Sequence, residues 1–259
     1  MSGALAAAFA RAKAEERAAL ICYAMGGDPS IAATEQLLLA LDACGADVIE
    51  LGVPFSDPIA DGPVLQAAAL RALESRASLT ALLKMTGRLA GKIRAPIVLM
   101  GYANPFFRYG LERFAQDAAA SGISGAIVPD LPLEEAHVLR DPLAAHGLDL
   151  VLLCAPTTGA ARLRAIAQAS RGFVYAVSVT GVTGARAELP PELTAYLTAL
   201  RAASPVPVAV GFGISRPEQA AAMSRLADGV VVGSALVDAH HRGGAGAAAA
   251  LVASLRAAL

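Results

Sequence analysis

Short apolar runs, many of them rich in β-branched residues, alternate along the chain with longer segments in which alanine and leucine recur at helical spacing. A run that is apolar at successive positions is typical of a parallel strand that is covered on both faces. Eight such runs predict strands: Ala19–Met25, Asp47–Leu51, Pro96–Tyr102, Gly125–Pro129, Asp149–Ala155, Gly172–Val179, Val206–Gly211 and Asp228–Val232.

The segments between these runs predict helices, because their apolar residues return every three or four positions. The predicted helices are Ile31–Cys44, Pro63–Leu89, Leu111–Ser121, Leu133–His146, Ala160–Ser170, Pro191–Ala203, Arg216–Ala227 and Gly246–Leu259. An additional amphipathic helix is expected before the first strand.

Eight strand–helix units in 259 residues fit a (β/α)8 barrel, the TIM barrel, which typically needs about 250 residues. We therefore predict an α/β fold with one domain over residues 1–259 and an extra N-terminal helix. A doubly wound open sheet is the alternative, and it would usually carry a glycine-rich dinucleotide fingerprint after the first strand. The first strand leads instead to Gly26-Gly27-Asp28-Pro29, which lacks that fingerprint, so the barrel is preferred.

The composition narrows the range of partners. Hydrophobic residues make up 56% of the chain, but alanine inflates this figure, and no uncharged run reaches the roughly 18 residues that a membrane span needs. The formal net charge is −1, so no electrostatic field attracts nucleic acid or an anionic bilayer. Charges follow from Arg11 onward without a basic leader, which indicates a cytoplasmic protein with no signal peptide.

The cysteines and histidines offer no reactive pattern. Cys22, Cys44 and Cys154 lie in apolar surroundings without a CxxC pair, and we expect them to be buried thiols. The four histidines stand apart from any nucleophile or metal-ligand spacing, so we expect surface or loop positions and no metal site; they are His137, His146, His240 and His241. Any catalysis must therefore use carboxylates, hydroxyl groups and backbone.

Glu50 is the most unusual residue within a predicted strand, because it lies near the carboxyl end of an apolar run. A carboxylate in a barrel core is costly unless it is hydrogen-bonded, paired or functional. Burial favours the neutral form, which suits a group that exchanges protons near neutral pH. From the residues alone, a paired structural carboxylate and a catalytic acid both remain open.

Two further carboxylates follow in the proline-rich loop after this strand. Asp57 and Asp61 are each typical of a turn or a helix cap when considered singly. Together with Glu50 they would lie at the carboxyl ends of the strands, where barrel enzymes place their active sites. The combination predicts a catalytic centre there, although loop chemistry does not choose between Asp57 and Asp61.

Three later loops complete the predicted site. Residues 178–186, SVTGVTGAR, form either a solvated loop or a mobile lid that excludes water from a ligand. GFGIS at 211–215 and VVGSA at 231–235 follow the seventh and eighth strands, where barrels often bind phosphate through backbone N–H groups and a helix N-terminus. We therefore predict phosphate binding at these two loops rather than plain turns.

These motifs resemble those of the tryptophan synthase alpha chain family. The match rests on IELGVPFSDPIADGP (49–63), GYANP (101–105), VPDLPLEE (128–135), SVTGVTGAR (178–186), GFGIS (211–215) and VVGSA (231–235). They occur in the family's order and at its spacing, and together with the barrel pattern they cover essentially the whole chain.

The resemblance implies retro-aldol cleavage of indole-3-glycerol phosphate to indole and D-glyceraldehyde 3-phosphate in tryptophan biosynthesis. Glu50 then matches the general acid/base, and Asp61 matches the carboxylate that binds the indole N–H and stabilises the indole cation. The substrate-binding positions of the family match Tyr23, Tyr102, Tyr175, Thr183 and Phe212, and its phosphate-binding positions match Gly184, Gly213, Gly233 and Ser234.

The resemblance also implies a partner, a tryptophan synthase beta chain in an α2β2 heterotetramer. Pyridoxal phosphate would belong to that beta chain, and no cofactor is expected in this one. Two alternatives are a free-standing indole-3-glycerol-phosphate lyase and a catalytically weak subunit that mainly activates a beta chain. The chain departs from the family pattern near the first strand, where Cys22 replaces a proline and Met25 replaces a threonine.

Overall fold

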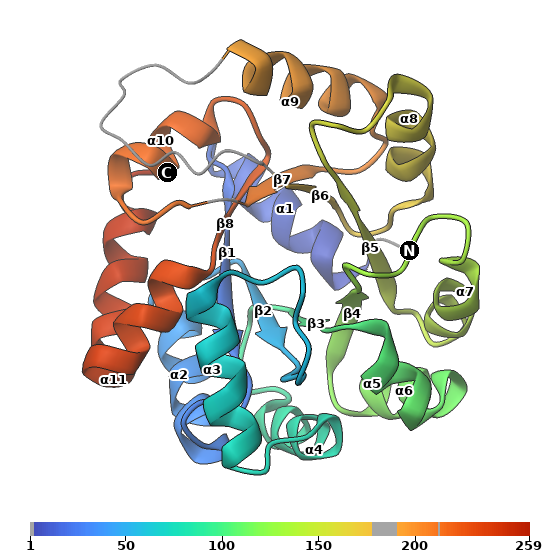
Figure 1. The fold of residues 1–259 in the computed structure, drawn as a ribbon. Helices are drawn as coiled ribbons and strands as arrows, with labels where there is room; N and C mark the ends of the chain where they lie inside the picture. Colours follow the sequence, from blue (N-terminus) through green and yellow to red (C-terminus); the bar gives the residue numbers. More distant parts are fainter. Residues whose placement is uncertain (1–2, 178–190, 212) are drawn as a thin grey trace.

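The computed structural model describes residues 3–177, 191–211 and 213–259, and it shows eight parallel strands in a closed barrel (Figure 1). Each strand pairs with the next, and β8 pairs with β1, so the predicted barrel is confirmed. The strands are β1 Ala19–Met25, β2 Val48–Gly52, β3 Ile97–Met100, β4 Ile123–Ile127, β5 Asp149–Cys154, β6 Val174–Val177, β7 Val208–Gly211 and β8 Gly229–Val232.

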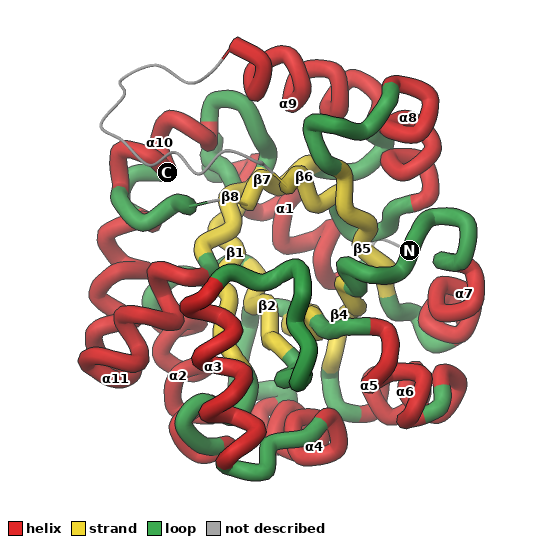
Figure 2. Tube along the Cα trace, viewed as in Figure 1, coloured by secondary structure: helices red, strands yellow, loops and turns green. Residues whose placement is uncertain are grey.

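The helices surround this ring of strands, except for the N-terminal helix, which packs against its interior (Figure 2). They are α1 Ala4–Ala14, α2 Ile31–Ala43, α3 Pro63–Glu74, α4 Leu79–Leu89, α5 Ala103–Tyr109, α6 Leu111–Ala120, α7 His137–Ala145, α8 Ala160–Ala169, α9 Pro191–Ala203, α10 Pro217–Ser224 and α11 Ser234–Arg256. In the described part of the chain, no helix is both long enough and apolar enough to cross a membrane.

The extra N-terminal helix α1 packs against the inward-facing side chains of the barrel. Its Leu5 and Phe9 join one buried cluster with strand residues such as Val48 and Val98. The Phe9 ring lies 5.4 Å from the Phe173 ring, measured between centroids. Because these side chains fill the interior, the barrel is a packed core below the carboxyl-end opening and not a channel.

Two predicted helices have different boundaries in the structure. The predicted helix Pro63–Leu89 is wrong as a single element, because the chain turns between α3 and α4 with Arg76 at a φ of +59°. Ser78 then caps α4 by accepting a hydrogen bond from the Ala81 N–H. The last helix begins at Ser234 and not at Gly246, with a kink at Gly243 and Gly244.

Other local predictions also need correction. Helix α5 was not predicted, and the helix predicted to start at Leu133 starts at His137.

His240 is buried, not a surface or loop residue, because it lies one turn after Leu236 on the inner face of α11. Cys22 and Cys154 are buried as expected, whereas Cys44 at the end of α2 is only partly buried.

A buried ion pair joins α1 to the barrel at the end opposite the strand carboxyl termini. Arg17, which follows α1, donates hydrogen bonds to both carboxylate oxygens of Asp47, one of them at 2.7 Å from Nη2. The same carboxylate accepts the Leu20 N–H of β1 at 2.8 Å. Both charged side chains are less than a tenth exposed, so neither charge is replaced easily by water.

We expect Arg17→Met to lower the free energy of unfolding by about 3 kcal/mol, because the substitution leaves the Asp47 carboxylate buried without its cation. Urea denaturation measures this change. Arg140→Met is the matched control, since the Arg140–Asp141 pair is exposed and its loss should cost about 0.5 kcal/mol or less. Equal costs for the two variants would contradict the assigned role of the Arg17–Asp47 pair.

Candidate active site

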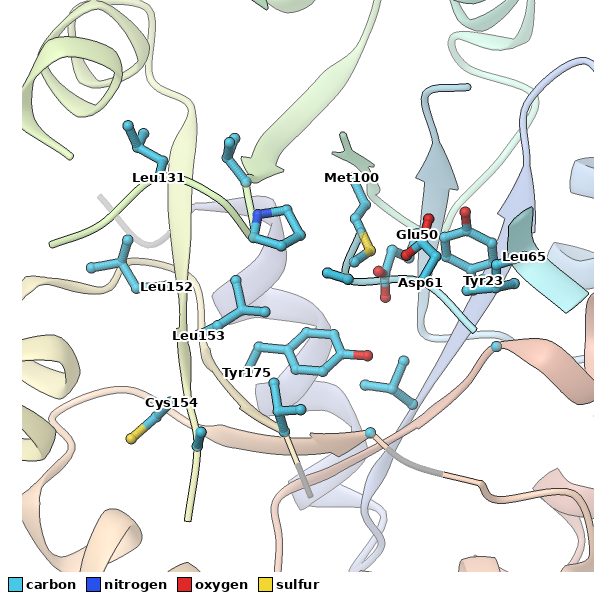
Figure 3. A pocket seen from close by; sticks show the side chains of 18 of the residues that line it. Tyr23, Glu50, Asp61, Leu65, Met100, Leu131, Leu152, Leu153, Cys154 and Tyr175 are labelled. Atoms are coloured by element: carbon cyan, nitrogen blue, oxygen red, sulfur yellow. The ribbon is translucent and has the colours of Figure 1, made fainter. Parts of the chain in front are cut away.

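A cavity of about 830 Å³ opens at the carboxyl ends of the strands (Figure 3). The side chains that line it come from strands on all sides of the barrel and from the loops that follow them. Seven of the residues singled out from the sequence are among its lining residues: Tyr23, Glu50, Asp61, Tyr175, Gly213, Gly233 and Ser234. Thr183, Gly184 and Phe212 lie outside the described residues.

Glu50 reaches the cavity from the inward face of β2. It pairs in register with Tyr23 of β1 and Val98 of β3, and Val48, two residues earlier, packs in the barrel core. The Glu50 side chain is buried, and neither of its carboxyl oxygens has a hydrogen-bond partner among the described residues. No described residue therefore forms the hydrogen-bonded pair that a structural carboxylate would need.

The protonation of Glu50 follows from this environment. Burial removes the carboxyl group from water, and the nearby negative charge of Asp61 adds to the effect, so the pKa of Glu50 rises from 4.5 to about 8. At neutral pH the group is mainly a neutral acid. It can therefore donate a proton into the cavity and can later accept one.

Asp61 occupies the loop between β2 and α3, and its side chain faces the same part of the cavity as Glu50 (Figure 3). Burial raises its pKa from 3.8 to about 6, and hydrogen bonding with Tyr102 partly opposes this increase. Asp57 is exposed, accepts a hydrogen bond from Ser56, and does not line the cavity. The structure thus separates two aspartates that the sequence could not rank by loop chemistry.

Two tyrosine rings border the cavity near the carboxyl groups, Tyr23 from β1 and Tyr175 from β6 (Figure 3). Each ring fits because a glycine lies beside it. A Cβ atom on Gly52 would lie 2.1 Å from the Tyr23 hydroxyl oxygen, and one on Gly211 would lie 2.4 Å from that of Tyr175. Burial, together with the charges of Glu50 and Asp61, raises the pKa of both phenols, so they remain neutral.

The opposite end of the site is formed by backbone at the ends of β7 and β8. Gly213, Gly233 and Ser234 line the main cavity and also a smaller adjoining one of about 320 Å³. Helix α11 begins at Ser234, with Gly233 as its N-cap residue. The first N–H groups of a helix have no partner within it and carry a partial positive charge, so this end can bind an anion.

Several lining residues could not be identified from the sequence. Met100, Leu152, Leu153 and Val231 belong to apolar strand runs, and nothing in those runs distinguishes cavity-facing positions from core positions. They give the middle of the cavity an apolar wall that suits an aromatic ring. Tyr102, in contrast, was predicted to bind substrate, but it is not among the residues that line the cavity.

The two departures near the first strand lie close to the site without lining it. Cys22 is buried in the core between barrel and helices, on the outer side of β1. The Met25 sulfur is 3.9 Å from the Tyr23 hydroxyl, which donates toward it. Among the described residues, no group of three or more His, Cys, Asp or Glu side chains is placed to hold a metal ion.

The arrangement provides a neutral acid beside a second carboxyl group, an apolar cavity wall, and a helix N-terminus at the other end of the cavity. The chain also matches a family model described as tryptophan synthase alpha chain over residues 9–257. It is 52% identical over 229 residues to the tryptophan synthase alpha chain of Citrifermentans bemidjiense, a match that covers 88% of this chain and 86% of the relative.

Solved structures agree with this match. A tryptophan synthase structure from Mycobacterium tuberculosis is similar with a TM-score of 0.93 at 40% identity, covering 100% of this chain and 98% of that one. The tryptophan synthase alpha subunit of Legionella pneumophila gives a TM-score of 0.91 at 39% identity, with coverage of 100% and 98%. The chain therefore belongs to the tryptophan synthase alpha chain family, and it is a lyase of tryptophan biosynthesis.

Proposed function

We propose that this chain cleaves indole-3-glycerol phosphate to indole and D-glyceraldehyde 3-phosphate, with Glu50 as general acid/base and Asp61 as the stabilising carboxylate. The observation that carries the proposal is the buried Glu50 carboxyl group, which has no hydrogen-bond partner among the described residues and faces the cavity beside Asp61. A buried polar group without a partner is costly to the fold, which favours a role for it in chemistry.

The reaction needs both carboxyl groups, each in a different protonation state. Glu50 gives its proton to C3 of the indole ring, and the ring nitrogen takes on positive charge. Asp61, as a carboxylate, accepts a hydrogen bond from the ring N–H and stabilises that charge. The bond from C3 to the glycerol carbon then breaks, its electron pair returns to the ring, and Glu50 removes the hydroxyl proton as the aldehyde forms.

The two pKa values define a pH window for this chemistry. Asp61 must be ionised, which requires a pH above about 6, and Glu50 must hold its proton, which requires a pH below about 8. The unequal environments therefore keep two neighbouring carboxyl groups in opposite protonation states near neutral pH.

The rest of the cavity would bind the remainder of the substrate. The apolar wall with Tyr23, Tyr175 and Leu153 suits the indole ring. Gly213, Gly233 and Ser234 would bind the phosphate through backbone N–H groups and the hydroxyl group. Thr183, Gly184 and Phe212 are assigned to the same site on their resemblance to the family alone.

Membership of the family implies a beta-chain partner. We propose that the two chains form an α2β2 complex, and that the beta chain holds the pyridoxal phosphate. This cofactor forms a Schiff base with a lysine, and none of the three lysines of this chain, Lys13, Lys84 and Lys92, lines the cavity. The exposed side chains of Ile59, in the loop after β2, and Phe107, on α5, offer apolar surface for the partner.

We expect Glu50→Gln to lower the rate of indole release by about 10³-fold or more, because the amide cannot donate or recover the transferred proton. The variant should still bind a phosphate-bearing substrate analogue, which fluorescence titration or calorimetry would measure. Glu112→Gln, on the exposed face of α6, is the control and should keep normal turnover. Turnover near the wild-type rate in Glu50→Gln would show that the assigned role is wrong.

We expect the unfolding free energy of the wild-type chain to decrease between pH 5 and 9 by roughly 3 to 5 kcal/mol more than that of Glu50→Gln. The pKa of Glu50 is near 4.5 in the unfolded chain and about 8 in the folded chain. Between pH 4.5 and about pH 8 the folded chain therefore keeps a proton that the unfolded chain has released. Stability is therefore lost as the pH rises toward 8. Urea denaturation at a series of pH values tests this, and parallel curves would mean that Glu50 is already ionised at neutral pH.

Indole release with and without a beta chain tests the proposed partnership. We expect the isolated chain to be slow and the beta chain to accelerate it, with Phe107→Ser weakening the acceleration more than Phe106→Leu, a substitution in the buried ring of the same helix. High turnover alone, with no complex on co-purification, would favour a free-standing lyase. Absence of indole release in both assays would favour a subunit that only activates its partner.

A further inference from the structure

Tyr102 contacts the loop that carries Asp61 at two points. It is the N-cap residue of α5, just after β3, and its side chain is buried. Its hydroxyl oxygen accepts a hydrogen bond from the Ala60 N–H at 2.8 Å. Its ring stacks on Phe55, with the centroids 5.3 Å apart and the planes 30° from parallel. One side chain thus contacts both the early and the late part of this loop.

The other hydrogen bonds of this loop give it less support. Asp61 N–H donates to the Pro58 carbonyl and Ile59 N–H to Asp57, both within the loop itself. The Gln66 amide donates to the Asp61 carbonyl at 2.8 Å, but this contact is exposed to water. Among the described residues, the Tyr102 hydroxyl makes the only side-chain hydrogen bond that links Ala60 to a strand end of the barrel.

The hydroxyl group has a second function available to it. Because the hydroxyl oxygen accepts from the Ala60 N–H, its proton is available for donation, and the carboxyl group of the next residue, Asp61, is the acid group on which it acts. This interaction stabilises the charged form and lowers the pKa of Asp61 against the effect of burial. Burial raises the pKa of Tyr102 to about 12, so the phenol keeps its proton throughout the working range.

We propose that Tyr102 is a positioning residue, which holds the Asp61 carboxylate in place through its hydroxyl group and its ring and does not itself bind substrate. The absence of Tyr102 from the residues lining the cavity supports this role. The inference rests on the proposed function only in so far as Asp61 stabilises the indole cation. The contact between Tyr102 and the loop exists without substrate.

A positioning residue and a substrate-binding residue have different kinetic effects. Loss of a contact made equally to substrate and transition state raises KM and leaves kcat unchanged, whereas loss of charge stabilisation at the transition state lowers kcat. Removing the Tyr102 hydroxyl also removes a donor from the Asp61 carboxylate, so the carboxyl group becomes easier to protonate. A purely structural defect would not move that titration.

The test compares Tyr102→Phe with Tyr109→Phe. Tyr109 lies on the same helix and donates from its hydroxyl to Asp117 at 2.6 Å, away from the cavity lining. For Tyr102→Phe, with the beta chain present, we expect kcat to fall roughly 10-fold and KM to change less than about twofold. We also expect the acidic limb of the kcat/KM profile to move upward by about half to one pH unit. Tyr109→Phe should change none of these.

A second readout does not depend on activity. Carbon-13 NMR of aspartate-labelled protein, with the Asp61 signal assigned by its loss in Asp61→Asn, follows the carboxyl titration in the isolated chain. The Tyr102→Phe variant should show the same upward shift there and a nearly unchanged melting temperature, since its ring still stacks on Phe55. If wild-type protein does not cleave the substrate, the proposed function fails, yet this titration still tests the Tyr102 contact.

Two results would overturn the proposal. An Asp61 titration that is the same in Tyr102→Phe as in wild type would show that the hydroxyl does not act on the carboxylate. A higher KM with unchanged kcat would return Tyr102 to the substrate-binding role that the sequence resemblance implies.

Discussion

The burial of the Glu50 carboxyl group inside a closed barrel is the constraint on which this site depends. Its oxygens have no hydrogen-bond partner among the described residues, so the fold keeps the group neutral and does not stabilise its charge. A carboxyl group that keeps its proton near neutral pH can act there as a general acid. The packed barrel interior keeps water away from this carboxyl group, and the cavity lined by Asp61 and the two tyrosines lies next to it.

The barrel supplies the isolation through its packing. Helix α1 and the inward-facing strand residues fill the interior below Glu50, so solvent has no route from the other end of the barrel. The Tyr23 ring can lie next to Glu50 because Gly52 leaves room for its hydroxyl group. Arg17 and Asp47 join the helix that fills the interior to the first two strands. The Arg17 and Asp47 charges at that distant end are paired with each other, in contrast to the Glu50 carboxyl group at the site.

The sequence predicted the barrel, all eight strands and the buried strand position of Glu50, because these depend on local patterns of burial. It failed where a boundary depends on a single backbone conformation, as at Arg76 between α3 and α4. It also does not reveal contacts between residues that are distant in sequence. His240 is buried because it belongs to α11, which begins at Ser234 and not at Gly246. Asp61 is distinguished from Asp57 because it lines the cavity. Tyr102 contacts Ala60, which lies 42 residues earlier in the chain. The family resemblance supplied the choice of Asp61 and a substrate-binding role for Tyr102, whereas the contact of Tyr102 with the loop comes from the structure.

The two carboxyl groups differ in their place in the fold as well as in their proposed roles. Glu50 belongs to a strand, and its position and protonation follow directly from the fold. Asp61 belongs to a loop, and its position depends on a few contacts such as that between Ala60 and Tyr102. If the two groups act together as proposed, movement of the loop alters the pair while the strand-borne acid stays in place. Because Ile59 of the same loop is exposed and apolar, a partner bound there would contact the loop that carries Asp61, and any shift of the Asp61 charge would also alter the pKa of Glu50.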